Sequence, residues 1–172
     1  GLSKAYIRPE QVACVDIEGN VSYGKPSGEL AMHLQVYRSC PAAKAVVHAH
    51  PPNAIAWSLA FPDLKELPCE ILPEVLLATG GIPIVPYARP TTQEMARALE
   101  PFLNRSKVMI LARHGGLSYG EDLDEAYRGM ERLEHSSEIL RYAFSLGEPQ
   151  KLPESELIEL RKMRETLSGK SL

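Results

Sequence analysis

The sequence is poor in cysteine, and the few cysteines it has follow no recognisable spacing. Cys14, Cys40 and Cys69 are odd in number and lie far apart. This arrangement excludes a disulfide framework as the main source of stability and favours reduced thiols, as in cytoplasmic proteins. The chain also lacks the CxxC spacing of many structural zinc sites. We therefore expect a cytoplasmic protein whose cysteines neither pair nor bind a metal.

Long apolar runs and long basic runs are also missing. No apolar stretch approaches the roughly 18 residues needed to span a bilayer, and the N-terminus has no secretory hydrophobic region. The formal net charge of −3, without a run of lysines or arginines, argues against nucleic acid or an anionic membrane as the main partner. A chain of 172 residues with 44% hydrophobic residues is expected to form one soluble domain, residues 1–172.

Strand-like and helix-like segments alternate along the chain. Residues 11–24 are expected to form a hairpin that turns at Gly19-Asn20. The alternation predicts an α/β protein, and the hairpin argues against an all-parallel sheet. Further strands are expected at residues 43–50, 82–87 and 107–113, and helices at 27–40, 53–61, 91–103, 121–147 and 153–167.

Three helix starts carry capping signals. Ser27 is the expected N-cap of the first helix, with Glu29 in its first turn. Thr91 and Glu94 have the spacing of a capping box, in which two side chains satisfy the first free amides of a helix. Asp122 and Glu125 form a similar cap at the start of the longest predicted helix.

Two histidines follow an apolar run in "AVVHAHPPN", residues 45–53. Side chains alternate along a strand, so His48 and His50 point the same way at the end of the expected strand. Two neighbouring imidazoles suit a metal ion. The alternative is a hydrogen-bonded pair with a structural role.

A third histidine, His114, ends the apolar run "KVMILAR". If the two strands are neighbours that end at one sheet edge, three imidazoles meet there, and Gly115 and Gly116 allow the backbone to turn closely. Three neutral nitrogen ligands with an open position are typical of a catalytic zinc site. The remaining histidines, His33 and His135, are expected to have packing or interface roles.

Glu29 is the candidate catalytic carboxylate. It follows Ser27-Gly28 in a loop that leads into a helix, where free backbone amides and the helix dipole attract anions. The alternative is that Glu29 only interacts favourably with that dipole.

These residues resemble the class II aldolase and adducin family. The resemblance rests on the segments "KPSGELAMHLQVYR", "AVVHAHPP", "GGIPIVPYA" and "ILARHGGLSYGEDLDEAYRGMERLEHSSEIL", which match in order and spacing over nearly the whole chain. It implies a three-layer α/β fold with a mixed, mainly antiparallel sheet flanked by helices. It also implies a C4 homotetramer with active sites between subunits.

The function implied by the resemblance is zinc-dependent cleavage of a phosphorylated ketose, such as L-fuculose phosphate, into dihydroxyacetone phosphate and an aldehyde. His48, His50 and His114 fall on the zinc ligands, and Glu29 falls on the catalytic glutamate. Gly1, Ser27 and Gly28 fall on positions that contact the substrate phosphate. The zinc, or another divalent transition metal, would stabilise the enediolate formed when the carbon–carbon bond breaks.

Glu74 falls near a second acid/base position of the family, where it would reach a neighbouring subunit's zinc. Its alternative role is that of a surface carboxylate at a helix start. The sequence departs from the family in lacking the N-terminal phosphate-binding segment before Gly1, so we expect it to be a fragment of a longer chain. Gly28 replaces a serine, and Arg113 replaces a polar residue before the third ligand. That arginine is expected to meet a substrate anion or a neighbouring subunit's carboxylate, or to be only a surface charge.

Two other functions fit the same residues. A sugar-phosphate epimerase or dehydratase would use the same metal site with a different second acid/base. A non-catalytic oligomerisation module, like the adducin head, would not need the three histidines.

Overall fold

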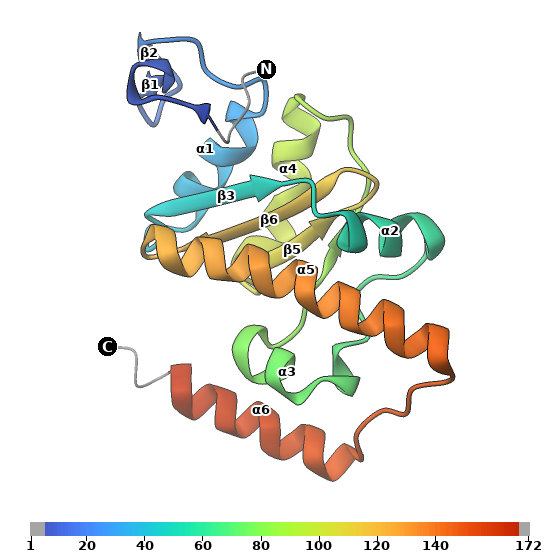
Figure 1. The fold of residues 1–172 in the computed structure, drawn as a ribbon. Coiled ribbons are helices and arrows are strands. Elements are labelled where there is room, and N and C mark those ends of the chain that lie inside the picture. The colour runs from blue at the N-terminus through green and yellow to red at the C-terminus, as the bar shows by residue number, and fades with distance from the viewer. Residues whose placement is uncertain (1–5, 169–172) are drawn as a thin grey trace.

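The centre of the protein is a four-stranded sheet, seen in a computed structural model that describes residues 6–168 (Figure 1). Its strands lie in the order β3-β6-β5-β4. The pairs β3–β6 and β6–β5 are antiparallel, and β5–β4 is parallel, which confirms the mixed, mainly antiparallel sheet. The strands are β3 (Ala45–Ala49), β4 (Ile84–Val85), β5 (Val108–Leu111) and β6 (Gly115–Gly120).

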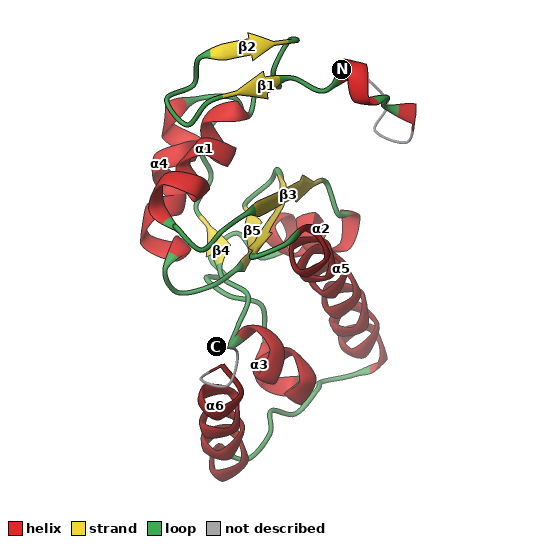
Figure 2. Ribbon diagram, turned by 90° about the vertical axis from the view of Figure 1, so that its left-hand side faces the viewer, coloured by secondary structure: helices red, strands yellow, loops and turns green. Residues whose placement is uncertain are grey.

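Helices cover both faces of this sheet and make three layers (Figure 2). On one face lie α1 (Leu30–Ser39) and α4 (Gln93–Leu103). On the other face lie α2 (Pro52–Ala60) and α5 (Leu123–Leu146). The shorter α3 (Pro73–Thr79) and α6 (Glu154–Ser168) pack against each other and extend the same core. None of the helices in residues 6–168 is both apolar and long enough to cross a bilayer.

The apolar run of β5 is continuous because both of its faces are covered. Val108 and Ile110 pack in the core under α5, while Met109 and Leu111 pack in the core under α4. All four are buried. Burying one such side chain stabilises the fold by about 1.5–3 kcal/mol. β5 therefore contributes to the cores on both faces of the sheet.

A separate two-stranded hairpin precedes α1. It pairs β1 (Cys14–Val15) with β2 (Val21–Tyr23) in antiparallel fashion, as the sequence predicts. The turn is held by Asp16, whose carboxylate accepts hydrogen bonds from the backbone and side-chain nitrogens of Asn20, both at 2.8 Å. The described part of the chain also contains two short 3-10 helices, η2 (Pro9–Gln11) and η3 (Cys69–Ile71).

One of the three predicted helix caps is correct. The Asp122 carboxylate accepts a hydrogen bond from the Glu125 backbone N–H at 2.7 Å at the start of α5. The first helix instead begins at Leu30, and its N-cap is Glu29, not Ser27. The Ser27 hydroxyl accepts a bond from the Glu29 N–H at 3.2 Å, so it supports the turn before the helix and does not cap it.

The prediction of a capping box at Thr91 is wrong. An N-cap residue has an extended backbone, and Thr92 has it, with φ −104° and ψ 162°. Thr91 lies in the left-handed region at φ +66°, so its side chain cannot take the cap position. The Thr92 hydroxyl donates to the Arg89 carbonyl at 2.6 Å.

The strand β6 is not among the predicted strands, and it changes the sheet order. Gly115 and Gly116 begin β6 after a tight turn from β5. Glycine is depleted in strands, so the pattern "HGGLSYG" indicates a turn better than a strand. From the sequence, β3 and β5 are expected to be neighbours. Instead they lie parallel to each other on either side of β6.

Candidate metal centre

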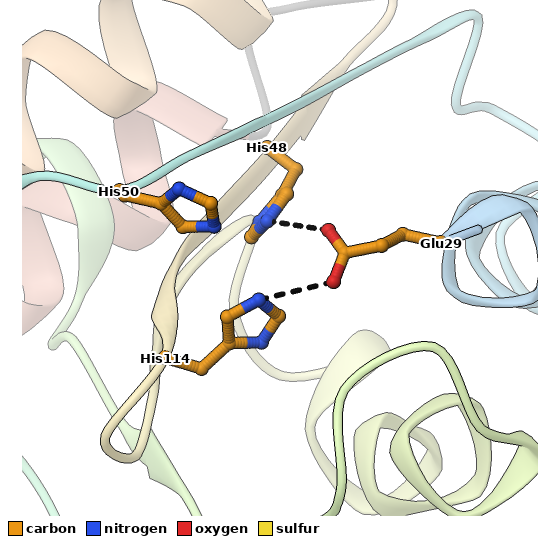
Figure 3. Close-up of side chains that lie close together, drawn as sticks. All are labelled: Glu29, His48, His50 and His114. Carbon is orange, nitrogen blue, oxygen red and sulfur yellow. Dashed lines mark ion pairs between the residues drawn. The ribbon is translucent and has the colours of Figure 1, made fainter. Parts of the chain in front are cut away.

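Three imidazole rings meet at one edge of the sheet (Figure 3). His48 lies in β3, His50 follows that strand, and His114 lies in the turn between β5 and β6. The ring centroids are 5.0 Å apart for His48 and His50, 4.9 Å for His48 and His114, and 5.2 Å for His50 and His114. The rings come together because β3 and β5, on either side of β6, end at the same edge.

Gly115 leaves the space that two of these rings fill. A Cβ atom on Gly115 would lie 2.5 Å from the Ala49 carbonyl oxygen and 2.9 Å from Cε1 of His48. It would also lie 3.1 Å from Cδ2 of His50. The glycine is therefore required here for space rather than for an unusual backbone angle.

Glu29 reaches the cluster from the start of α1. Its Oε2 lies 2.8 Å from Nε2 of His48, and its Oε1 lies 3.0 Å from Nε2 of His114 (Figure 3). Glu29, His48, His50 and His114 each offer one potential ligand atom, and these four atoms lie within 4.8 Å of one another. A carboxylate with three imidazoles is a ligand set able to hold a divalent metal ion.

The protonation of His48 fits a metal ligand. Its Nδ1 lies 2.8 Å from the Gly116 carbonyl oxygen, an acceptor only, so Nδ1 carries the proton and donates it. Burial lowers the pKa of His48 to about 4 against the opposing effect of the Glu29 carboxylate, so the ring is neutral at pH 7. Burial also lowers the pKa of His114.

In the neutral ring, the lone pair on Nε2 of His48 points at a carboxylate oxygen 2.8 Å away. Two lone pairs in contact repel each other unless a cation is shared by the nitrogen and the oxygen. The second ring nitrogen of a metal-binding histidine usually donates to a carbonyl or carboxylate, as Nδ1 does here to Gly116. The donor set therefore fits a divalent cation.

Ser58 supports the turn that carries His114, and no pattern in the sequence indicates this role. The Arg113 backbone N–H donates to the Ser58 hydroxyl at 2.9 Å, and that hydroxyl donates to the Ile55 carbonyl at 2.8 Å. Arg113 has a left-handed backbone at φ +62°, which closes the turn, and it is exposed. Its side chain faces solvent, where it is accessible to an anion.

Glu134 of α5 is a second residue that sequence reasoning missed. Pro51 and Pro52 follow His50 and have no backbone N–H to donate, so the first free amides of α2 belong to Asn53 and Ala54. The Glu134 carboxylate accepts bonds from both amides at 3.1 Å and from the Asn53 side chain at 2.8 Å. It thereby ties the chain just after the histidine pair to α5.

The residues predicted to bind phosphate lie in the loop before α1, with one exception. Gly1 lies outside the described residues. Ser27 and Gly28 are exposed. A Cβ on Gly28 would lie 3.1 Å from Cγ2 of Thr91, so a residue without a side chain fits there without moving Thr91.

Glu74 is not part of the cluster. It is exposed in the first turn of α3, and α3 lies on the other side of the sheet from α1 (Figures 1 and 2). Its role at a neighbouring subunit's site stays a prediction. Of the other histidines, His33 is half-buried on α1 and His135 is exposed on α5.

Comparison with known proteins defines the class. Residues 1–140 match the family Class II Aldolase and Adducin N-terminal domain, and the chain belongs to this family. It is 35% identical over 161 residues to 3-oxo-tetronate 4-phosphate decarboxylase of Escherichia coli (strain K12), covering 89% of this chain and 73% of the relative. It is 32% identical over 139 residues to an L-fuculose phosphate aldolase of Methanococcus maripaludis (strain DSM 14266), covering 81% and 74%.

Solved structures show the same fold. An L-fuculose 1-phosphate aldolase superposes with a TM-score of 0.81 at 26% identity, covering 94% of this chain and 76% of that one. YgbL from Escherichia coli, described as a candidate aldolase, epimerase or decarboxylase, superposes with a TM-score of 0.80 at 34% identity, covering 90% and 75%. The expected fold class is therefore confirmed.

Proposed function

We propose that the protein is a metal-dependent lyase that breaks a carbon–carbon bond beside the carbonyl group of a phosphorylated ketose. The observation that carries this proposal is the convergence of Glu29, His48, His50 and His114, with four potential ligand atoms within 4.8 Å. His48, His50 and His114 would hold zinc or another divalent transition metal. We place the reaction in the cytoplasm, where free thiols such as those of Cys40 and Cys69 stay reduced.

The bound metal would supply Lewis acidity, which polarises the carbonyl and hydroxyl oxygens of the substrate. The residues of the chain prepare the site for it. Burial keeps His48 neutral, because its pKa lies at about 4, and the Gly116 carbonyl fixes its ring orientation. Gly115 keeps His48 and His50 close together.

Glu29 would handle the proton at the reacting carbon. When the bond breaks, its electron pair remains beside the carbonyl and forms an enediolate. Glu29 would then pass a proton from solvent to that carbon, so that its carboxylate is restored at the end of the step. A carboxylate at the N-cap of α1 is also stabilised by the helix dipole.

The phosphate group would bind in the loop before α1. The Ser27 hydroxyl accepts a bond from the Glu29 N–H, and its own proton remains available for a phosphate oxygen. Gly28 exposes its backbone, and the free amides at the start of α1 attract an anion. Gly1, which lies outside the described residues, falls on a further phosphate-contacting position by the family resemblance.

Aldol cleavage needs a second base. The hydroxyl on the departing fragment must lose its proton as it becomes an aldehyde. No other carboxylate joins Glu29 in the cluster among residues 6–168. The family resemblance places Glu74 near a second acid/base position, so we assign this step to Glu74 of a neighbouring subunit in a homotetramer with active sites between subunits.

A second candidate reaction is the decarboxylation of a 3-oxo sugar acid phosphate. It is favoured by the 35% identity to 3-oxo-tetronate 4-phosphate decarboxylase. Loss of carbon dioxide from that acid leaves the enediolate of dihydroxyacetone phosphate, which is also the enediolate left by cleavage of L-fuculose phosphate. The two reactions share the metal, Glu29 and the phosphate site, and they differ in the leaving group and in the need for a second base.

The test is a direct comparison of two substrates. Zinc-loaded protein is incubated with L-fuculose 1-phosphate and with 3-oxo-tetronate 4-phosphate, and dihydroxyacetone phosphate is measured by reduction with a coupled dehydrogenase. Release of dihydroxyacetone phosphate with an aldehyde supports the aldolase, and its release with carbon dioxide supports the decarboxylase. If neither substrate nor any other ketose phosphate reacts, while one metal ion per chain is bound, the lyase proposal is wrong and an epimerase, a dehydratase or a non-catalytic module remains.

A further inference from the structure

A second candidate binding site lies at the edge of the sheet opposite to the histidine cluster. It is a cavity of about 410 Å³ between the end of α4, the start of β5 and the first half of α5. β5 runs from this cavity, where Val108 lines the wall, to the turn that carries His114. None of Glu29, His48, His50 or His114 lines it.

The walls of this cavity are basic, although the whole chain has a net charge of −3. Four cationic side chains line it, from Arg105, Lys107, Arg132 and Arg164, and one acidic side chain, from Glu125. Glu125 is bound to Lys107 at 2.8 Å, so this pair is neutral. The three arginines leave an excess of positive charge.

Two of these arginines, Arg132 and Arg164, have no acidic partner within the described part of the chain, whereas Arg105 interacts electrostatically with the Glu66 carboxylate. Neither Arg132 nor Arg164 has an ion pair or a side-chain hydrogen bond to any of residues 6–168. The Arg164 guanidinium lies against Gly80, where a Cβ atom would be 2.8 Å from its Cζ. The guanidinium of Arg164 can pack this closely because Gly80 has no side chain.

Two buried polar atoms without a hydrogen-bond partner among residues 6–168 belong to residues that line this cavity. They are Nε of Arg164 and the hydroxyl of Ser118. Most buried polar atoms in proteins have a partner, so each exception needs a physical explanation. A ligand whose acceptor atoms enter the cavity would pair with the Arg164 guanidinium, which has no ion pair or side-chain hydrogen bond to residues 6–168.

We propose that this cavity binds the phosphate group of a small phosphorylated molecule. Arginine is suited to phosphate because its planar guanidinium offers paired donors at a fixed spacing. A volume of about 410 Å³ exceeds the size of inorganic phosphate and is within the range of small-ligand pockets. The site is separate from the proposed active site, and binding there does not depend on the proposed reaction.

The test uses inorganic phosphate and pyrophosphate as probes on the full, metal-loaded chain. Binding is followed by amide chemical shifts at constant ionic strength. This measurement reports on each residue, so it separates binding in the cavity from phosphate binding at the proposed active site. We expect shifts at residues 104–107 and at Gly129, with a concentration dependence that differs from any shifts at Gly28. Arg132→Ala and Arg164→Ala should each weaken this response about tenfold, as expected for the loss of a charge-assisted contact.

Lys162→Ala is the matched control, because it removes one positive charge from α6 at an exposed residue that does not line the cavity. It should bind phosphate like the wild type. Arg132 is exposed, so its variant remains informative even if Arg164→Ala unfolds. Shifts confined to the loop before α1, or an unchanged response in the folded Arg132→Ala variant, would overturn the proposal.

Discussion

The Glu134 carboxylate accepts a hydrogen bond from the side chain of Asn53 at 2.8 Å and two more from its backbone N–H at 3.1 Å. This contact joins α5 to the first turn of α2, directly after the second proline and three residues beyond His50 in sequence. We therefore expect the geometry of the histidine cluster to depend on Glu134, although Glu134 contacts no candidate ligand.

Replacing Glu134 should weaken both the fold and the metal site. Glu134→Ala leaves the amides of Asn53 and Ala54 without an acceptor, and we expect it to lower the free energy of unfolding by about 2 kcal/mol. Zinc affinity should fall about tenfold, as for other residues that support metal ligands. Denaturant unfolding and zinc competition measure the two effects.

Glu134→Gln keeps one oxygen acceptor and should recover part of both losses. Glu138→Ala, one turn along α5, removes a half-buried carboxylate that pairs only with Tyr142 among residues 6–168 and should change stability by less than about 0.5 kcal/mol. If Glu134→Ala lowered stability but left zinc affinity unchanged, the positioning role would be refuted.

Gly115→Ala should disrupt the cluster through steric contact alone. The added methyl group would lie 2.5 Å from the Ala49 carbonyl oxygen and 2.9 Å from a ring atom of His48. We expect a loss of stability of about 1–3 kcal/mol and a clear fall in zinc affinity. Denaturant unfolding and zinc competition again measure both quantities.

Gly147→Ala is the control for this experiment, because nothing in the described part of the chain lies within 4 Å of a Cβ atom at that position. It should leave both quantities near their wild-type values. Equal zinc affinity in Gly115→Ala and wild-type protein would show that the rings do not need this space.

Acid should destabilise the metal-free protein through His48. Burial lowers its folded-state pKa from 6.5 to about 4, so between these values the unfolded chain takes up a proton that the folded chain does not. The free energy of unfolding should therefore fall as the pH drops from 6.5 towards 4, by about 3 kcal/mol at most. Urea unfolding of chelator-treated protein at several pH values measures this slope.

The His48→Gln variant should show a shallower slope over the same range, since it has no imidazole to protonate. Carboxylates titrate near the lower end of this range in both proteins, so the difference between the two slopes is the informative quantity. Identical slopes would contradict a neutral, buried His48.

Glu74 should distinguish the two candidate reactions. Aldol cleavage needs a base for the hydroxyl of the departing aldehyde, whereas carbon dioxide leaves without giving up a proton. Glu74→Gln should therefore slow release of dihydroxyacetone phosphate from a ketose phosphate by about 100-fold or more. Any decarboxylation of 3-oxo-tetronate 4-phosphate should stay within about threefold of the wild-type rate, since no base is needed there.

Glu156→Gln serves as the comparison, because it changes an exposed glutamate in the first turn of another helix. It should leave both rates unchanged. Unimpaired aldol cleavage in Glu74→Gln would mean that another group is the second base.

Much of this site could be predicted from the sequence because its signals are local. The spacing of His48 and His50 after an apolar run indicates two rings on one face of a strand, and His114 ends a second such run. Asp122 and Glu125 mark the start of α5 correctly. In each case the residues that make the signal are close in sequence.

The parts that could not be predicted depend on contacts between distant residues. β6 begins with two glycines, whose strand conformation comes from pairing with β3 and β5 and not from propensity. Glu134 lies 81 residues from Asn53, and Ser58 lies 55 residues from Arg113. Thr91 has the spacing of a cap, but its left-handed backbone rules this role out.

The most direct test of the metal centre is the zinc K-edge X-ray absorption spectrum of the zinc-loaded protein. We predict three imidazole nitrogens at about 2.0–2.1 Å, with oxygen from Glu29 or solvent completing the coordination and no sulfur. A sulfur shell at about 2.3 Å would place the zinc on a cysteine. A signal from fewer than three imidazoles would mean that His48, His50 and His114 do not all bind the same zinc ion. Either result would contradict a metal centre built from these three histidines.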